Sequence, residues 1–227
     1  MTLINPLFDF FIPRFCSFCK IKLLPDEELI CPECRDTIDS ASPERLTAEY
    51  QKKFSSENLV EEFASAFVFE REGVLQNLIH QLKYEKKFRV GIFLGLISSS
   101  HIIKQLKLWN CDYIIPVPLH PKKLAERGYN QSYFIANGMG KNLKIKSLNK
   151  AMKRIRFTQT QTNLTLLERK KNVEGAFALK RGFDPINKKI ILVDDVITTG
   201  ATISECAKVL KNKGAEKIYA ASVAIAD

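Results

Sequence analysis

The sequence lacks a long apolar run, a secretory leader and an internal repeat. No segment reaches the roughly 18 uninterrupted apolar residues that a membrane span requires, because three serines and His101 break the longest uncharged stretch, 90–103. The first residues carry no basic leader, and Asp9 interrupts their apolar pattern, so we expect no signal peptide. These absences exclude a transmembrane protein and lead us to expect a cytoplasmic one.

Histidine is scarce, and two common nucleotide-binding motifs are missing. His80, His101 and His120 are scattered along the chain, and we expect ordinary packing or surface positions for all three. The sequence has no Gly-Lys-Ser or Gly-Lys-Thr of a Walker loop and no Gly-x-Gly-x-x-Gly of a dinucleotide fold. Any phosphate site must therefore be built in another way.

The composition is that of an ordinary globular protein. The 227 residues are 45% hydrophobic and 26% charged, which is enough to build a sizeable core. This length suits one domain of about 150 to 200 residues with a small appendage.

Four of the six cysteines form two Cys-x2-Cys pairs, Cys16 with Cys19 and Cys31 with Cys34. In a reducing cytoplasm this spacing favours a tetrahedral Zn²⁺ site over disulfides, and a set of four thiolates leaves no open position for catalysis. We therefore expect a structural zinc knuckle, with a redox pair or incidental thiols as the alternative. Cys111 and Cys206 lie beside apolar residues and are expected to be buried and unreactive.

The positive charge is concentrated in one stretch. The net charge is +10, whereas residues 141–171 hold ten cations and one acid, and the first 60 residues hold seven cations and ten acids. A polyanion such as single-stranded DNA would dock on this stretch, mainly through its phosphates because few aromatic residues are present for stacking. A solvated lysine-rich face is the alternative. The candidate DNA contacts are Lys150, Lys153, Arg154, Arg156, Arg169, Lys170 and Lys171.

Short apolar runs alternate with helical patterns after residue 62. Strands are expected at 63–69, 113–118, 189–194 and 217–225, and helices at 74–84, 90–108, 129–141 and 201–212. This order predicts an α/β fold with a mainly parallel twisted sheet flanked by helices, which binds ligands at the carboxyl ends of its strands. We divide the chain into a zinc knuckle at 1–42, a connecting segment at 43–62 and the α/β domain at 63–227.

The most specific motif follows the strand at 189–194. Four aliphatic residues lead into Asp194 and Asp195, and a short loop rich in threonine and glycine then opens a helix. Free amides at a helix start suit a phosphate, and two adjacent carboxylates suit a sugar diol or Mg²⁺. The sequence therefore predicts a site for a phosphorylated sugar, with a strand that ends in a threonine-capped helix as the alternative.

At these residues the chain resembles the type I phosphoribosyltransferases, which use 5-phosphoribosyl-1-pyrophosphate (PRPP). Four further motifs, Pro116-Val-Pro-Leu119, Arg127-Gly-Tyr-Asn-Gln131, Arg154-x-Arg156-x-Thr158-x-x-Gln161 and Arg169-x-x-Asn172-x-x-Gly-Ala-Phe177, fall in the order of the ComF family, named for bacterial competence. That family also begins with a Cys-x2-Cys zinc knuckle, so the resemblance covers nearly the whole chain.

The resemblance implies a role for each matching residue. Asp194 and Asp195 would hold the ribose hydroxyls, and Arg127 would begin a hood over the substrate and neutralise pyrophosphate; these three are the catalytic candidates. Lys83 would contact a phosphate or lie on a solvated face, and Arg127 would otherwise be a surface arginine. The remaining PRPP contacts would be Val196, Ile197, Thr198, Thr199, Gly200, Ala201 and Thr202, with Val117, Pro118 and Leu119 facing pyrophosphate.

The resemblance also implies a cellular role. It predicts a PRPP-binding protein that uses Mg²⁺ with PRPP, handles single-stranded DNA in natural transformation and works beside a competence helicase. Two alternatives remain open, namely an active phosphoribosyltransferase of nucleotide salvage or modification and a PRPP-sensing DNA-binding protein without turnover. No set of residues in the sequence reads an acceptor base.

Overall fold

A computed structural model describes residues 13–157 and 171–226. Its centre is a five-stranded sheet in the order β1-β7-β6-β2-β3, and every neighbouring pair is parallel. The strands are β1 (Glu62–Val68), β2 (Tyr113–Pro116), β3 (Lys146–Ser147), β6 (Lys189–Ile197) and β7 (Lys217–Ile225). The predicted parallel sheet is confirmed.

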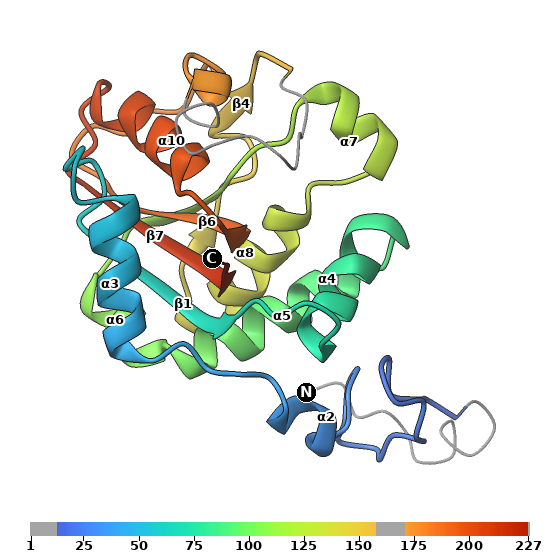
Figure 1. Cartoon of the computed structure of the whole chain (residues 1–227). Helices are drawn as coiled ribbons and strands as arrows, with labels where there is room; N and C mark the ends of the chain where they lie inside the picture. Colours follow the sequence, from blue (N-terminus) through green and yellow to red (C-terminus); the bar gives the residue numbers. More distant parts are fainter. Residues whose placement is uncertain (1–12, 158–170, 227) are drawn as a thin grey trace.

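Helices cover both faces of this sheet (Figure 1). Ile191 and Val193 of β6 pack with one set of helices, while Ile190 and Leu192 pack with the other. A central parallel strand that is buried on both faces needs such a continuous apolar run. The first set is α4 (Val74–Tyr84), α5 (Phe88–His101), α6 (Ile103–Leu108) and α8 (Gln131–Leu143); the second is α3 (Pro43–Lys53) and α10 (Ala201–Lys211).

Two helical predictions differ from the structure. The predicted helix 90–108 is divided at Ile102 into α5 and α6. Before this break the Ser98 and Ser99 hydroxyls donate to the carbonyls of Leu94 and Gly95 at 2.6 and 2.7 Å, and such bonds bend helices. The second difference is α7 (Pro121–Arg127), which was not predicted although it begins with proline and is followed by Gly128 at φ +81°.

The segment predicted as a connection contains an ordered helix. Ser42 caps α3 by accepting the Arg45 amide, and Leu46, Tyr50 and Phe54 pack into the core on the α10 side of the sheet. Part of the segment 43–62 therefore belongs to the α/β core.

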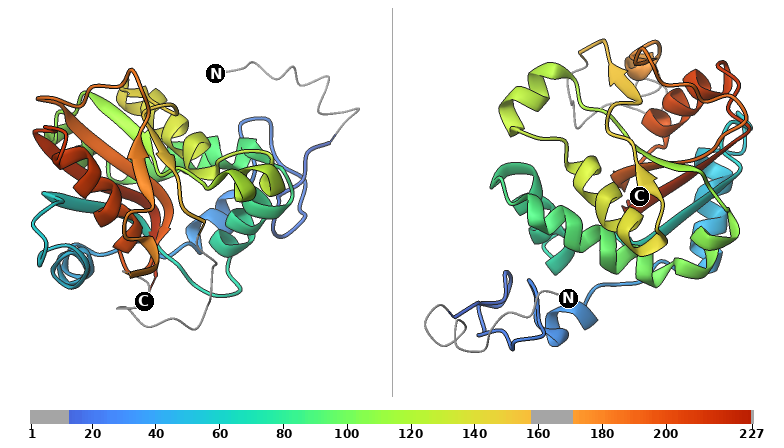
Figure 2. Two further views of the ribbon diagram at one scale, coloured as in Figure 1. Left: turned by 90° about the horizontal axis from the view of Figure 1, so that it is seen from above. Right: turned by 180° about the vertical axis from the view of Figure 1, so that it is seen from behind.

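Two smaller pieces complete the chain. Strands β4 (Met152–Arg154) and β5 (Phe177–Leu179) form an antiparallel pair beside α10. The cysteine-containing segment, with α2 (Pro32–Asp36), lies at the far end of the molecule from α10 (Figures 1 and 2). Among the helices that the structure describes, none has the length and apolar character needed to cross a bilayer.

Candidate functional site

Asp194 and Asp195 lie within β6, which continues to Ile197 and is therefore three residues longer than predicted. The Ser132 hydroxyl at the start of α8 donates to Asp194 Oδ1 at 2.9 Å, and the Asp195 amide donates to the same oxygen at 2.9 Å. Lys83 Nζ on α4 lies 2.8 Å from Asp195 Oδ2. The two acids thus face side chains from α8 and α4 at the carboxyl end of the sheet.

The two neighbouring acids shift the pKa values of the ionisable groups in this site. Burial and the neighbouring Asp195 raise the pKa of Asp194 to about 7, despite the hydrogen bonds from Ser132 and from the Asp195 amide. Burial alone would lower the pKa of Lys83, but Asp195 and Asp194 outweigh it and raise that pKa above its ordinary value. Lys83 therefore stays protonated, and a further cation or hydroxyl donor would relieve the pair of acids.

The loop at 198–202 joins β6 to α10. Gly200 is the residue before the helix, with φ +75° and no side-chain cap, and the Thr199 hydroxyl accepts the Ala201 amide at 3.4 Å. The first amides of a helix lack partners within the helix, so the start of α10 offers donors to an anion. The structure places Thr198 and Thr199, at the surface, next to these donors.

The fold leaves no room for a side chain at Gly200. A Cβ at this position would lie 2.8 Å from Cε1 of Phe54, which follows α3. Gly200 is therefore needed both for its positive φ and for the close approach of the Phe54 ring.

The predicted turn at 116–119 lies next to β6. Pro116 pairs with Val193, and the Val117 amide donates to the Val193 carbonyl at 2.9 Å. Asn130, which caps α8, donates from Nδ2 to the Val117 carbonyl at 2.9 Å. These bonds hold Val117, and with it Pro118 and Leu119, beside the carboxyl end of β6.

Four cations from three elements lie near the acids, namely Lys83 of α4, Lys123 and Arg127 of α7, and Arg154 of β4. Burial, Arg127 and Arg154 lower the pKa of Lys123, and Lys83 contributes in the same direction, so these four charges are close enough to repel. Burial lowers the pKa of Arg154, while Asp194 acts against that effect. These four cations and the two acids therefore form one group of interacting charges at this end of the sheet.

The predicted DNA contacts in the basic stretch lie in different environments. Arg154 is half-buried, its guanidinium lies over the Phe177 ring at 5.2 Å, and it interacts electrostatically with Asp194. Arg156 Nη2 donates to the carbonyls of Lys171, Asn172 and Glu174, which gives it a structural role. Lys150, Lys153 and Lys171 are exposed; Arg169 and Lys170 lie outside the described residues.

Sequence reasoning missed Ser132 and Lys123. Ser132 stands two residues after the capping Asn130, and Lys123 lies on a helix that was not predicted. The proline of α7 after His120 and the glycine at its end were the available signals.

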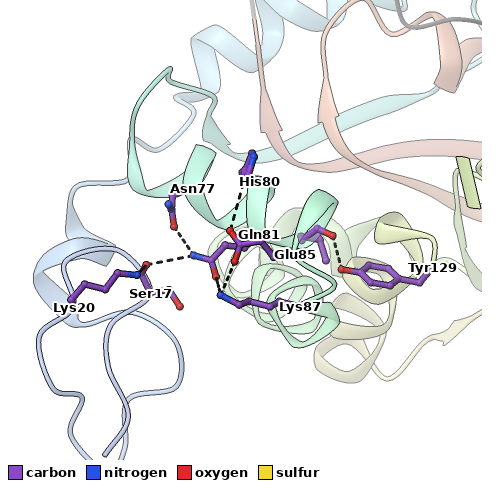
Figure 3. A network of polar contacts seen from close by, with 9 residues as sticks. Ser17, Lys20, Asn77, His80, Gln81, Glu85, Lys87 and Tyr129 are labelled. Atoms are coloured by element: carbon purple, nitrogen blue, oxygen red, sulfur yellow. Dashed lines mark hydrogen bonds and ion pairs between the residues drawn. The ribbon is translucent and has the colours of Figure 1, made fainter. Parts of the chain in front are cut away.

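A polar network fixes α4, which carries Lys83 (Figure 3). Gln81 Nε2 donates to Asn77 Oδ1 at 2.6 Å and, at 3.5 Å, to the Ser17 carbonyl of the cysteine-containing segment. Lys87 Nζ donates to Gln81 Oε1 at 3.1 Å, and the Tyr129 hydroxyl donates to the Leu82 carbonyl. The carboxyl end of α4 is therefore held from both sides.

Cys16, Cys19, Cys31 and Cys34 lie together, with their sulfurs all within 4.8 Å of one another. A tetrahedral zinc with Zn–S bonds of about 2.3 Å requires sulfurs about 3.8 Å apart, and Cys19 Sγ lies 3.6 Å from Cys31 Sγ. The four sulfurs thus fit a zinc ion.

Electrostatics support this fit. Burial opposes ionisation of Cys16, but the amides of Cys31, Cys19 and Phe18 donate to its sulfur and lower its pKa to about 6. Burial and the neighbouring cysteines raise the pKa of Cys34. Four thiolates this close repel each other unless a cation lies between them.

The other cysteines and the histidines agree with the sequence analysis. Cys111 and Cys206 are buried, and burial raises the pKa of both thiols, that of Cys111 to about 12. His120 Nδ1 accepts the Lys122 amide at 3.2 Å and so caps α7, while His101 packs against the Phe67 ring.

Comparison with known proteins agrees with this architecture. Residues 127–226 match the model of the phosphoribosyl transferase domain. Competence protein F of Haemophilus influenzae is 35% identical over 150 residues, which are 63% of this chain and 65% of that protein. The aligned part therefore spans just under two thirds of the length of this relative.

Two further matches extend the comparison. DNA utilization protein YhgH of Salmonella typhimurium is 28% identical over 207 residues, covering 89% of this chain and 86% of that protein. The solved purine phosphoribosyltransferase of Pyrococcus horikoshii is 18% identical and covers 63% of this chain and 75% of its own, with a TM-score of 0.32, too remote to support a conclusion. The chain thus combines a type I phosphoribosyltransferase fold and a four-cysteine cluster with similarity to competence protein F and to the DNA utilization protein YhgH.

Proposed function

We propose that the carboxyl end of β6 binds PRPP. Asp194 and Asp195 would accept hydrogen bonds from the ribose hydroxyls, the amides and threonines of 198–202 would bind the 5′-phosphate, and the turn at 117–119 would face pyrophosphate. The observation that carries this proposal is the meeting of two carboxylates, an uncapped helix start and four cations at one end of the sheet. A site for a phosphate ion alone would not need the carboxylates, the helix start and the cations together.

Lys83 has two roles in this proposal. Without a ligand it neutralises Asp195 at 2.8 Å. When a ribose hydroxyl takes its place on Asp195, Lys83 becomes available to the pyrophosphate of the same ligand. Binding thus exchanges one ion pair for another and leaves no buried charge alone.

The remaining cations match the negative charge of pyrophosphate. Arg127, Lys123 and Arg154 would stabilise the charge that develops as the bond from pyrophosphate to the anomeric carbon breaks. Asp194 and Asp195 could hold Mg²⁺, since carboxylate oxygens are the ligands it prefers, and the ion would supply further neutralisation of the negative charge of PRPP. The residues of this chain hold the sugar and keep its leaving group in place.

We also propose that the protein acts in the cytoplasm on single-stranded DNA during natural transformation, beside a competence helicase. Its relatives are named for competence and for DNA utilization. The exposed Lys150, Lys153 and Lys171 offer phosphate contacts on the outer surface.

Calorimetric titration of the protein with PRPP and Mg²⁺ tests the site. The double variant Asp194→Asn, Asp195→Asn should weaken binding by at least about 3 kcal/mol, because each charge-assisted hydrogen bond contributes about 1.5 to 3 kcal/mol. Asp26→Asn with Glu28→Gln makes the same change of charge at two exposed acids and should bind as the wild type does. Equal affinity in the two double variants would refute the site.

Turnover separates this proposal from its alternatives. A phosphoribosyltransferase releases pyrophosphate when a suitable acceptor is added to the PRPP complex. A PRPP-sensing protein releases none and instead changes its affinity for DNA on addition of PRPP and Mg²⁺. Titrations with DNA that superimpose with and without PRPP would exclude the sensing role.

A further inference from the structure

Exposed aromatic rings and cations lie together beside the proposed PRPP site. They come from the end of α4, the start of α5, α7 and the residues that follow β4, and we call them the aromatic rim. Its members are Tyr84, Phe88, Lys122, Lys123, Arg127 and Phe157. In Figures 1 and 2, α4 and α7 lie on the same side of the molecule.

Tyr84 joins the rim to the site. Tyr84 is 65% exposed, its ring centroid lies 4.9 Å from that of His80, and it follows Lys83, whose ammonium group is bound to Asp195. The guanidinium of Arg127 lies over the Tyr84 ring at 5.7 Å from its centroid. A side chain of α7 thus meets α4 through an exposed aromatic face.

Phe157 repeats the arrangement on the other side of α7. Its ring is 37% exposed, with Lys122 Nζ at 5.2 Å from the centroid and the His120 ring at 5.0 Å. Lys123, the next residue, is close enough to Arg154 for the two charges to repel. The rim therefore runs from Tyr84 across α7 to Phe157.

The charge of this surface is strongly positive. Residues 83–89 hold four cations and one acid, and residues 120–127 hold three cations and one acid. By contrast, the outer basic surface around Lys150 and Lys153 has no aromatic residue between positions 141 and 156. Among the described residues of these two surfaces, the exposed aromatic side chains Tyr84, Phe88 and Phe157 belong to the rim.

Cations that follow a phosphate backbone and aromatic faces that stack on bases are the two components of single-strand binding. We propose that the aromatic rim binds single-stranded DNA, with bases stacked on Tyr84 and Phe157 and phosphates at Lys122 and Lys123. The strand then crosses the mouth of the PRPP site, next to Lys83 and Arg127. This inference rests on the proposed function in taking DNA as the partner, and it assigns that partner a surface.

Anisotropy titrations with a fluorescein-labelled oligothymidylate of about 20 nucleotides test the stacking. Tyr84→Ala should weaken binding at least about fivefold, the lower end of the effect of one base–aromatic stack, whereas Tyr84→Phe keeps the ring and the affinity. Leu108→Ala, at an 84% exposed apolar side chain of α6, is the control and should bind as the wild type does. No binding by the wild type, or equal affinity of Tyr84→Ala and Tyr84→Phe, would overturn the inference.

The salt dependence of the same titrations locates the phosphates. The double variant Lys122→Gln, Lys123→Gln should reduce the logarithmic salt slope by about 1.4, or about 0.7 for each phosphate contact. Lys213→Gln with Lys217→Gln removes two exposed lysines at the opposite, amino end of β7 and should leave the slope unchanged. If only Lys150→Gln with Lys153→Gln reduces the slope, the DNA lies on the outer basic surface and the rim is excluded.

Calorimetry with PRPP and Mg²⁺ on the Tyr84 variants separates this inference from the proposed function. PRPP binding that persists in Tyr84→Ala, with DNA binding lost, supports the rim as a site of its own. PRPP binding by the wild type without any effect of Tyr84→Ala on DNA would refute the rim alone. Absence of PRPP binding in the wild type would refute the PRPP site, while the DNA titrations still decide the rim.

Discussion

Asp194 carries the pH dependence of the site. Burial and Asp195 raise its pKa to about 7, far above the 3.8 of an exposed aspartate. The folded chain therefore binds more protons than the unfolded chain between these two values, and the contribution of Asp194 to stability falls as the pH rises from about 4 to about 7. A ribose hydroxyl donates to the charged form of the carboxylate and so favours loss of the proton.

We therefore expect PRPP binding to release a proton from Asp194. At pH 7, calorimetry in two buffers of different ionisation enthalpy should show about half a proton more released by the wild type than by Asp194→Asn, because Asp194 is then half ionised. At pH 9 the difference should vanish, since the carboxyl group is already ionised. Equal proton release by the two proteins at pH 7 would contradict the assignment.

The site residues that the sequence predicted without the family resemblance are those that lie together along the chain. Asp194, Asp195 and the loop to Thr202 form one continuous motif, so their neighbourhood is set by local geometry. Ser132 and Arg154 reach Asp194 only because α8 and β4 are brought to β6 by tertiary packing. A spacing of about 40 to 60 residues in one sequence carries no signal for such contacts.

Among the elements, α3 is a helix that the amino-acid composition of its segment does not predict. Its 11 residues are mostly polar, which is why the segment 43–62 reads as a connection. Yet Leu46, Tyr50 and Phe54 recur at intervals of four, the spacing of one helix face, and Ser42 and Pro43 mark its start. The four-residue spacing of these apolar side chains therefore indicates a helix, whereas the average polarity of the segment does not.

The contact between α3 and the phosphate loop gives a prediction at this scale. Gly200→Ala should destabilise the fold in urea, because φ +75° strains a residue with a Cβ and that Cβ would meet the Phe54 ring at 2.8 Å. Gly182→Ala is the matched variant, with φ +88° but nothing within 4 Å of the added Cβ. We expect Gly200→Ala to lose at least about 1 kcal/mol more than Gly182→Ala. Equal losses of stability in the two variants would show that the Phe54 ring moves aside with no cost in free energy.

At the scale of the whole molecule, two kinds of stabilisation are combined. The α/β part buries two apolar clusters on opposite faces of one sheet. The cysteine-containing segment is short; Leu23, Ile30 and Ile38 pack into one of these clusters, and we expect the rest of its stability to come from an ion held by the four sulfurs. Structural zinc contributes on the order of 10 kcal/mol to such small modules.

Metal analysis should therefore return about one zinc for each chain. Cys16→Ser with Cys19→Ser should lose it and make residues 13–42 sensitive to protease, because the remaining two sulfurs cannot hold the module together. Cys111→Ala changes a buried cysteine outside the cluster and should retain the metal. A full complement of zinc in the double variant would contradict the assignment of the ligands.

The arrangement of elements was the most predictable level of all. Parallel order follows from alternating strands and helices, because a helix crossover leaves successive strands pointing the same way. The sequence did not indicate the break at Ile102 or the use of Arg156 to bind carbonyls, since both depend on competition between side chains and the backbone. Such local competition is decided only in the folded chain.

The packing of Phe54 against Gly200 has a consequence for dividing this protein. A shortened chain that starts at Glu62, where the sheet begins, would contain all five strands of the sheet. It would lack Phe54, however, whose ring packs against the turn that precedes α10. The smallest unit that keeps this contact starts at Ser42, where α3 is capped, even though the cysteines are left behind. Because Phe54 packs against Gly200, the α/β part of the molecule begins at Ser42. This is 20 residues before Glu62, where the polar segment ends and the sheet begins.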